Sequence, residues 1–287
     1  MKNTTLPFRL LFLTFLTPGL FTGLLLRAES PAITVQDGIH VFTPSSPFLG
    51  EDCDVRVLLP DPLEPGKRYR TLYVLPVVGV KGRGEFGDGL EELRKADAHN
   101  RWGLIVVAPS FDSVPWYGSH ATDPKIRHEQ YLKEVVVPFV EKNFPATGQS
   151  SDRLLLGFSK SGWGAVSLLL RDPDFWGAAC SWDAPLMMDQ QKLGWGSARH
   201  FGTPEHAVPH LPVTLARSKA AAFTDSPPRL FILGKNIYGK HTREFHDLLT
   251  EVKIPHHYDN SLAFKHRWDS GWLPPALELM FGNAPSD

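Results

Sequence analysis

The sequence predicts an α/β fold in which a mostly parallel central sheet of about eight strands is covered by helices on both faces. Short apolar runs alternate with longer amphipathic stretches along most of the chain. Strands without helices between them come first, and strands and helices alternate afterwards, which predicts an antiparallel start. The expected strands lie near residues 39–42, 53–59, 71–77, 104–108, 153–156, 178–182, 229–233 and 256–258. The expected helices lie near residues 89–98, 126–143, 161–171, 241–252 and 275–281, with a short one near 215–222.

The N-terminus differs from the rest of the chain. Lys2 and Arg9 precede an apolar stretch at residues 10–26, which only threonines, one proline and two glycines interrupt. This pattern predicts a secretory signal peptide over residues 1–28, with cleavage after Ala28. An uncleaved membrane anchor is the alternative, because the stretch is about the shortest that spans a bilayer. Either interpretation puts the folded part outside the cytoplasm, secreted or periplasmic, and no stable membrane insertion is expected after leader removal.

The remaining residues, 29–287, are expected to form one domain without internal repeats. Two segments do not fit the alternation of strands and helices: the glycine-rich residues 78–88 and the longer residues 185–228. Both follow strands, and open α/β sheets bind ligands at the carboxyl ends of their strands. We therefore expect both segments to form pocket walls, the longer one as a cap or as surface elaboration.

Composition and charge exclude several classes of function. Of the 287 residues, 42% are hydrophobic and 21% are charged, as in an ordinary globular protein. The formal net charge is -1 and no basic block is present, so no nucleic-acid partner is expected. Cys53 and Cys180 are too few for a disulfide framework in a chain of this length. Buried free thiols are expected, and a single disulfide is the alternative.

Residues 154–165 carry the most informative pattern, an apolar strand followed by a turn of small residues around one serine and then an apolar helix. The pattern is typical of a nucleophile elbow, in which the serine side chain projects above the sheet at a strained junction. Gly157 provides the first small residue of the usual G-x-S-x-G pattern, whereas Ser161 stands at its last position and Gly162 follows. Ser159 is therefore the candidate nucleophile, and an ordinary strand-to-helix turn is the alternative.

A serine nucleophile needs a histidine base within hydrogen-bond reach and usually a carboxylate that orients the base. In elbow enzymes the acid and then the histidine follow the serine along the chain. His266 comes after the last expected strand and before the final helix, so it is the candidate base; an exposed loop histidine is the alternative. Asp183, at the carboxyl end of a buried strand, is the candidate acid, with a turn-forming aspartate as the alternative. Asn236 is the other candidate for orienting the histidine.

The negative oxygen of a tetrahedral intermediate requires backbone N–H donors. One donor is expected to be the amide of Lys160, the residue after the nucleophile. The second is expected to be the amide of Val77 or Val78, in the loop that follows the strand at 71–77. The glycines of this loop do not indicate a phosphate site, because no Gly-Lys-Ser/Thr pair opens a helix there.

Trp116 and Tyr117 follow another strand end. Their side chains are expected either to bind substrate, as the lining of an acyl or sugar pocket, or to pack beneath the following long helix. The sequence contains no His-Glu-x-x-His motif, so no metal site is expected.

These residues together resemble those of a known family, the esterase D-like serine esterases of the α/β-hydrolase superfamily, which include feruloyl esterases and mycolyltransferases. The resemblance covers most of the chain after about residue 50 and rests on residues 155–165 (LLGFSKSGWGA), residues 201–205 (FGTPE), His266 and the strand order. It implies the α/β-hydrolase fold and hydrolysis of acyl esters through a serine acyl-enzyme, with no cofactor. Ser161 departs from the family pattern, and so does the missing carboxylate after the strand at 229–233. Some α/β-hydrolases, including pancreatic lipase, carry the acid one strand earlier.

We therefore expect an exported serine carboxylic-ester hydrolase that acts on a small-molecule or carbohydrate ester. Acyl transfer to a sugar or another alcohol is an alternative, because an acyl-enzyme reacts with acceptors other than water. A third interpretation is a catalytically silent hydrolase-fold protein that binds carbohydrate or cell-wall components, since a fold does not determine a function.

Overall fold

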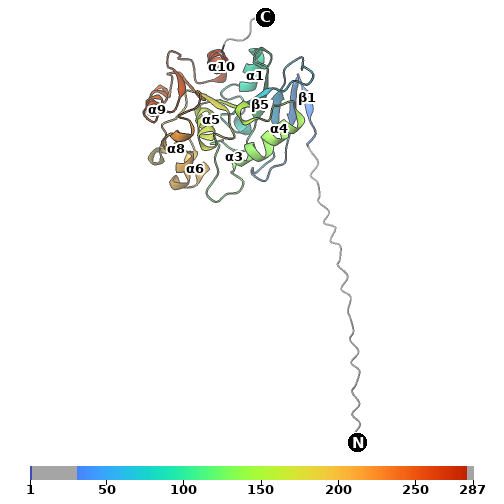
Figure 1. Ribbon diagram of the computed structural model, residues 1–287, viewed down its shortest axis with the longest axis horizontal. Coiled ribbons are helices and arrows are strands. Elements are labelled where there is room, and N and C mark those ends of the chain that lie inside the picture. The colour runs from blue at the N-terminus through green and yellow to red at the C-terminus, as the bar shows by residue number, and fades with distance from the viewer. Residues whose placement is uncertain (2–30, 283–287) are drawn as a thin grey trace. The chain divides into compact units, whose positions relative to one another are not determined.

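The computed structural model describes Met1 and residues 31–282, and the latter form one nine-stranded sheet between two layers of helices (Figure 1). Except for Met1, the predicted signal peptide lies outside the described residues. The mostly parallel sheet with helices on both faces confirms the predicted α/β class, with nine strands in place of about eight.

The strand order in the sheet is β1-β2-β3-β5-β4-β6-β7-β8-β9. The strands are β1 (Thr34–Gln36), β2 (Ile39–Phe42), β3 (Val55–Leu58), β4 (Arg70–Val74), β5 (Leu104–Pro109), β6 (Arg153–Phe158), β7 (Ala178–Trp182), β8 (Leu230–Leu233) and β9 (His256–Asp259). The first three strands pair antiparallel, β3 also pairs antiparallel with β5, and the strands from β5 to β9 in this order are parallel. Only β1 was not predicted, because its three residues are all exposed and show no apolar alternation.

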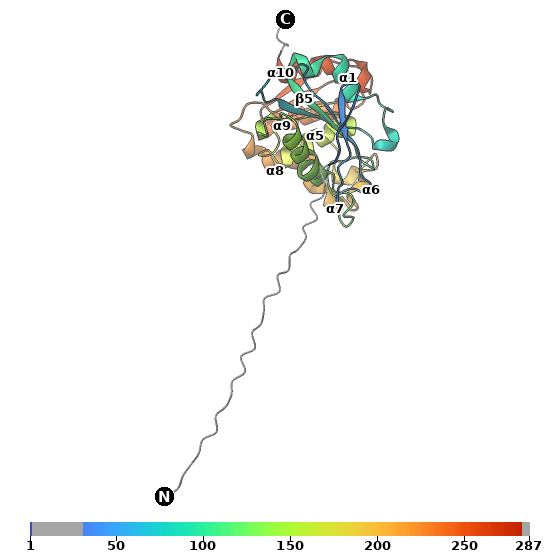
Figure 2. The same cartoon turned by 90° about the vertical axis from the view of Figure 1, so that its right-hand side faces the viewer.

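Both faces of the sheet are covered by helices, as Figures 1 and 2 show from two directions. Buried residues of α4, α5, α8 and α9 pack on one face, and those of α1, α2 and α10 pack on the other. These helices are α1 (Gly89–Lys95), α2 (Ala98–Arg101), α4 (Val137–Asn143), α5 (Ser159–Arg171), α8 (Pro212–Lys219), α9 (Gly239–Glu251) and α10 (Leu273–Phe281).

Shorter helical segments fill the connections. They are η1 (Val80–Gly82), α3 (His128–Gln130), the π-helix η2 (Tyr131–Val136), η3 (Ser150–Asp152), η4 (Gln190–Lys192), α6 (Ser197–Phe201), α7 (Pro204–Ala207), η5 (Val208–His210), η6 (Ala220–Ala222) and η7 (Trp268–Ser270). The long helix expected at residues 126–143 is thus α3, η2 and α4 in succession. The helices α6 and α7 were not predicted, because four or five residues are too few to show a helical period.

Cys53 and Cys180 are buried free thiols, so the disulfide that we considered does not form. Burial raises the pKa of Cys53 to about 12, and nearby carboxylates add to this, which keeps the thiol protonated. Among the helices of residues 31–282, none combines the length and the apolar character that a membrane span requires.

Histidines are buried where residues 118–128 pack against α6 and η5. Burial lowers the pKa of His200 to about 3 and that of His210 to about 3, and it lowers the pKa of His128 as well. The nearby cation Arg171 lowers the pKa of His200 and His210 further. The folded protein therefore keeps these imidazoles neutral at a pH where an unfolded chain protonates them.

We expect the free energy of unfolding to fall as the pH decreases from about 6.5 to about 3, on the order of several kcal/mol. In this window the unfolded chain binds protons at His200 and His210 and the folded chain does not. Urea unfolding at pH 7, 5.5 and 4 measures the effect. A His257→Gln variant, which changes an exposed histidine, is the control. Its free energy of unfolding should change with pH as that of the wild type does. A free energy of unfolding that is constant with pH would contradict the prediction.

Candidate active site

Ser159 lies at the junction between β6 and α5, where the strand ends at Phe158 and the helix begins without a linking residue. Its φ of 53° is in the left-handed region, which residues other than glycine rarely adopt. Strain of this kind persists only where the surrounding structure holds it, and it is concentrated at functional sites. The geometry is that of a nucleophile elbow.

Close backbone packing around the elbow explains its small residues. A Cβ atom on Gly157 would lie 2.4 Å from the carbonyl of Ser161, and one on Gly162 would lie 2.6 Å from Oγ of Ser181 in β7. The hydroxyl of Ser161 donates to the carbonyl of Phe158 at 2.8 Å and accepts the Phe158 N–H at 3.1 Å. Ser161 therefore closes the turn through its side chain, and Gly162 provides the close approach to the neighbouring strand.

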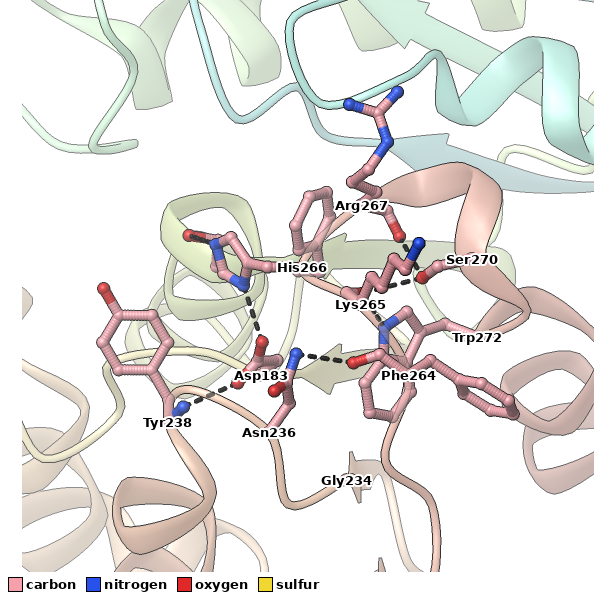
Figure 3. A network of polar contacts seen from close by, with 12 residues as sticks. Asp183, Gly234, Asn236, Tyr238, Phe264, Lys265, His266, Arg267, Ser270 and Trp272 are labelled. Carbon is pink, nitrogen blue, oxygen red and sulfur yellow. Dashed lines mark hydrogen bonds and ion pairs between the residues drawn. The ribbon is translucent and has the colours of Figure 1, made fainter.

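The imidazole of His266 joins the elbow to the end of β7. Its Nε2 atom lies 2.9 Å from Oγ of Ser159, and its Nδ1 atom lies 2.6 Å from Oδ2 of Asp183. The loop that carries His266 is held in place by Trp272, whose Nε1 donates to the carbonyl of Lys265 at 2.8 Å (Figure 3). The structure thus brings together the three residues for which we predicted nucleophile, base and acid roles.

Asp183 is fully buried directly after β7, and both of its carboxylate oxygens have partners. One oxygen contacts His266, and the other accepts the backbone N–H of Tyr238 at 2.6 Å (Figure 3). Its φ is 43°, again in the left-handed region. A buried carboxylate is stable only when it is paired and hydrogen-bonded, and these contacts supply both. Burial and the charge of Asp183 raise the pKa of Tyr238 to about 12.

Asn236 has a different partner from the one we considered. Its side-chain amide donates to the carbonyl of Phe264, two residues before the candidate base (Figure 3). The Nδ1 atom of His266 is instead bonded to Asp183. Asn236 therefore positions the loop that carries His266, and it does not orient the imidazole directly.

The expected oxyanion donors follow two neighbouring parallel strands. β4 pairs with β6, and the N–H of Leu75 continues this pairing by donating to the carbonyl of Leu156 at 2.9 Å. Within the described residues, the N–H groups of Val77 and Val78 donate no hydrogen bond. The Lys160 N–H is in the first turn of α5, where backbone N–H groups have no acceptor within the helix. The amides of Lys160, Val77 and Val78 are thus free to bind a negative oxygen near the carboxyl ends of β4 and β6.

Of our two interpretations of Trp116 and Tyr117, packing in the core is observed, and the lining of a substrate pocket is not. Both side chains are fully buried. Trp116 packs edge-on against Trp163 with ring centroids 5.2 Å apart, and Tyr117 lies so close to Gly164 of α5 that a Cβ there would clash with its ring. The residues pack against the helix that begins at the elbow, because their loop turns inward after β5.

Tyr117 instead anchors the loop after β4 that carries Val77 and Val78, because its hydroxyl donates to the carbonyl of Pro76, next to Val77. We expect Tyr117→Phe to lower the free energy of unfolding by about 1 to 2 kcal/mol, since it leaves a carbonyl oxygen without its partner. It should also lower kcat. Urea unfolding and initial rates measure the two effects. Tyr69→Phe is the matched control, because it removes a remote hydrogen bond to the Glu64 N–H and should leave kcat unchanged. Equal kcat values for both variants would contradict the anchoring role.

A cleft of about 470 Å³ opens beside this site. Both segments that we expected to form pocket walls contribute to it. Its lining is Val78, Gly79, Lys81, Gly82, Glu85, Asp112, Ser113, Val114, Ile126, Trp195, Gly196, Arg199 and His200. A path of rings leads from the cleft to the base: Trp195 contacts Tyr238 with centroids 5.4 Å apart, and Tyr238 lies 5.8 Å from His266. Trp195 is 51% exposed, so its ring faces the cleft mouth.

Several contributions were missed by sequence reasoning. The Tyr238 N–H is a backbone group and has no sequence signal of its own. The turn-closing role of Ser161 did have a sequence signal, because serine side chains readily form hydrogen bonds to the backbone near helix N-termini. Tyr117 was noticed, but whether it lines a pocket or packs in the core was left open, since a strand-end position does not reveal burial. Within residues 31–282, no three side chains of the metal-ligating types are grouped to hold a metal ion.

Comparisons with known proteins agree with this geometry. The model of the Esterase family, described as "Putative esterase", matches residues 46–226. FphF of Staphylococcus aureus, a fluorophosphonate-binding serine hydrolase, is similar in structure with a TM-score of 0.66 and 20% identity, over 85% of this chain and 98% of that chain. A ferulic acid esterase gives a TM-score of 0.60 at 19% identity, over 80% and 91%. MPT51 of Mycobacterium tuberculosis gives 0.62 at 17%, over 82% and 94%. These structures confirm the α/β-hydrolase fold. No curated protein matches the chain by sequence.

Proposed function

The chain belongs to this Esterase family, and from that membership we propose that it is a serine carboxylic-ester hydrolase that works through an acyl-enzyme at Ser159. The observation that carries the proposal is the continuous hydrogen-bond chain from Ser159 through His266 to Asp183. A nucleophile, a base and an acid that orients the base are the parts that acyl transfer requires.

The first half of the proposed reaction forms the acyl-enzyme. Oγ of Ser159 attacks the ester carbonyl carbon while its proton passes to Nε2 of His266, 2.9 Å away. The carboxylate of Asp183 keeps a proton on Nδ1 and stabilises the imidazolium that forms. The tetrahedral intermediate collapses when the carbon–oxygen bond to the alcohol breaks, and His266 gives its proton to that alcohol.

The second half repeats the chemistry with water. His266 removes a proton from a water molecule, which attacks the acyl carbon, and the acid leaves as Ser159 recovers its proton. In both halves the negative oxygen is bound by the amide of Lys160 and by that of Val77 or Val78. Removing one such donor costs on the order of 3 kcal/mol of transition-state stabilisation in comparable enzymes.

A fluorophosphonate probe and short 4-nitrophenyl esters test the proposal together. FphF is a fluorophosphonate-binding serine hydrolase, and we expect the same reactivity at Ser159. Peptide mass spectrometry of the labelled protein should place the probe on Ser159, and ester turnover should show an initial burst of 4-nitrophenol. Unlabelled Ser159 would refute the proposal and would favour the silent binding protein. Acyl glycerol as the main product in added glycerol would favour acyl transfer over hydrolysis.

We also propose that the enzyme acts outside the cytoplasm, secreted or periplasmic. The support is the charged and then apolar pattern of residues 1–28, which is typical of a cleaved leader. Sequencing the N-terminus of the protein after expression in a bacterial host tests it. A mature chain that begins at Glu29 is the expected result, and an intact Met1 in a membrane fraction would favour the anchor.

A further inference from the structure

Tyr238 contributes its side chain, as well as its backbone N–H, to the surroundings of the candidate base. Its ring centroid lies 5.8 Å from that of the His266 imidazole. Figure 3 shows the phenol on the side to which Nε2 of His266 points, with the hydroxyl at the free end of the ring. Oγ of Ser159 lies 2.9 Å from the same Nε2 atom. The Tyr238 hydroxyl is therefore on the side of the imidazole where the proposed reaction takes place.

Aromatic and backbone contacts hold the phenol in this position. Trp195 contacts its ring with centroids 5.4 Å apart, and His241 does so with centroids 5.5 Å apart, both at nearly right angles. The backbone of Tyr238 is held as well, because its N–H donates to Asp183 at 2.6 Å. A side chain that is already ordered loses little freedom when it binds a ligand. The position of the hydroxyl is thus set before a substrate binds.

The Tyr238 hydroxyl is a hydrogen-bond donor that no described protein group uses. Within residues 31–282 it has no hydrogen-bond partner, and it remains accessible to solvent. Burial and the charge of Asp183 raise the pKa of Tyr238 to about 12, so the hydroxyl keeps its proton at neutral pH. A protonated phenol can donate a hydrogen bond to an oxygen of a ligand.

The order of the strands decides which substrate oxygen this donor can reach. Strands β4, β6, β7 and β8 are neighbours in that order. The expected oxyanion donors follow β4 and β6, whereas Tyr238 follows β8, on the other side of the elbow. The negative oxygen of the intermediate faces the donors after β4 and β6. The oxygen of the leaving alcohol faces His266, because Nε2 gives it a proton.

We infer that the Tyr238 hydroxyl is a further catalytic group, which donates a hydrogen bond to the alcohol oxygen of the ester as that oxygen leaves. The inference rests on the proposed function. When the carbon–oxygen bond breaks, its electron pair moves to this oxygen and Nε2 of His266 transfers its proton there. Tyr238 keeps its own proton and stabilises the negative charge that grows on the oxygen. In the second half of the reaction the same hydroxyl would hold the attacking water.

Two esters that differ only in the leaving group test this role. In 4-nitrophenyl acetate the nitro group already stabilises the departing oxygen, and phenyl acetate lacks that group. We expect Tyr238→Phe to lower kcat/KM for phenyl acetate by about tenfold, the effect of a hydrogen bond to a charged group, and for 4-nitrophenyl acetate by about twofold. The variant keeps the ring and the backbone N–H, so the contacts with Trp195, His266 and Asp183 remain.

A matched tyrosine variant separates this role from a structural one. Tyr69→Phe removes a phenolic hydroxyl whose partner, the Glu64 N–H, is remote from the site. It should leave kcat/KM for both acetates as in the wild type. If the Tyr238 hydroxyl acted only on the structure of the site, Tyr238→Phe would lower kcat/KM for the two acetates by the same factor.

The outcomes distinguish this inference from the proposed function. Absence of fluorophosphonate labelling at Ser159 in the wild-type protein refutes the esterase itself. With Ser159 labelled, a loss in Tyr238→Phe that is not larger for phenyl acetate overturns the inference and leaves the esterase intact. If Ser159 is labelled but neither acetate is hydrolysed, a phenyl phosphonate ester and its 4-nitrophenyl counterpart supply the comparison through their rates of labelling, because they lose the same two phenols.

Discussion

Replacing Ser159 with alanine is expected to lower kcat for 4-nitrophenyl esters by about 10⁶-fold. Without Oγ no acyl-enzyme forms, and His266 loses the hydroxyl that lies 2.9 Å from its Nε2 atom. Stopped-flow assays should show neither a burst nor steady turnover above background, and a fluorophosphonate probe should no longer label the protein.

A matched serine variant separates loss of the nucleophile from loss of the fold. Ser151→Ala changes an exposed serine of η3 just before β6, and it should retain wild-type kcat and labelling. Alanine at position 159 must still adopt a φ of 53°, so far-UV circular dichroism should verify that the variant is folded. A kcat within tenfold of the wild-type value in a folded Ser159→Ala protein would contradict the acyl-enzyme mechanism.

Asp183→Asn is expected to lower kcat by about 10⁴-fold, as it does where an aspartate orients a catalytic histidine. The Tyr238 N–H donates to one oxygen of Asp183, so an asparagine would keep its carbonyl oxygen there. Its NH₂ group would then point at Nδ1 of His266, which must accept a hydrogen bond. The imidazole would carry its remaining proton on Nε2 and could not act as a base toward Ser159.

Steady-state kinetics at pH 7.5 measure the effect of Asp183→Asn. Asp189→Asn is the control, because it makes the same chemical change at an exposed aspartate that caps η4. We expect the control to retain wild-type kcat. A near-normal rate in Asp183→Asn would show that the carboxylate is dispensable and would require another account of how the base is oriented.

The sequence was sufficient for much of the fold and for the three central side chains. Apolar runs located eight of the nine strands, since buried parallel strands are continuous apolar segments. The strand-turn-helix pattern located Ser159, and the order of elements located His266. Asp183 followed from the rule that ligand-binding groups collect at the carboxyl ends of parallel strands.

What the sequence could not supply depends on three-dimensional packing. Trp116 and Tyr117 also follow a strand end, yet their loop turns inward and they became core residues. Nothing local distinguishes them from Trp195, whose position in the cleft lining depends on how residues 185–228 pack in three dimensions. The second bond of the Asp183 carboxylate comes from a backbone group, and backbone donors can be assigned only from coordinates.

Because the candidate acid directly follows β7, the turn after β8 supports the site without supplying the acid. That turn supplies a backbone N–H from Tyr238, which any residue except proline can provide, and the Asn236 contact to the loop of the base. Ile237 between them is 64% exposed. We therefore expect position 237 to tolerate substitution. A library randomised at Ile237 would change the surface near the site and would leave the contacts made by Asn236 and by the Tyr238 N–H in place.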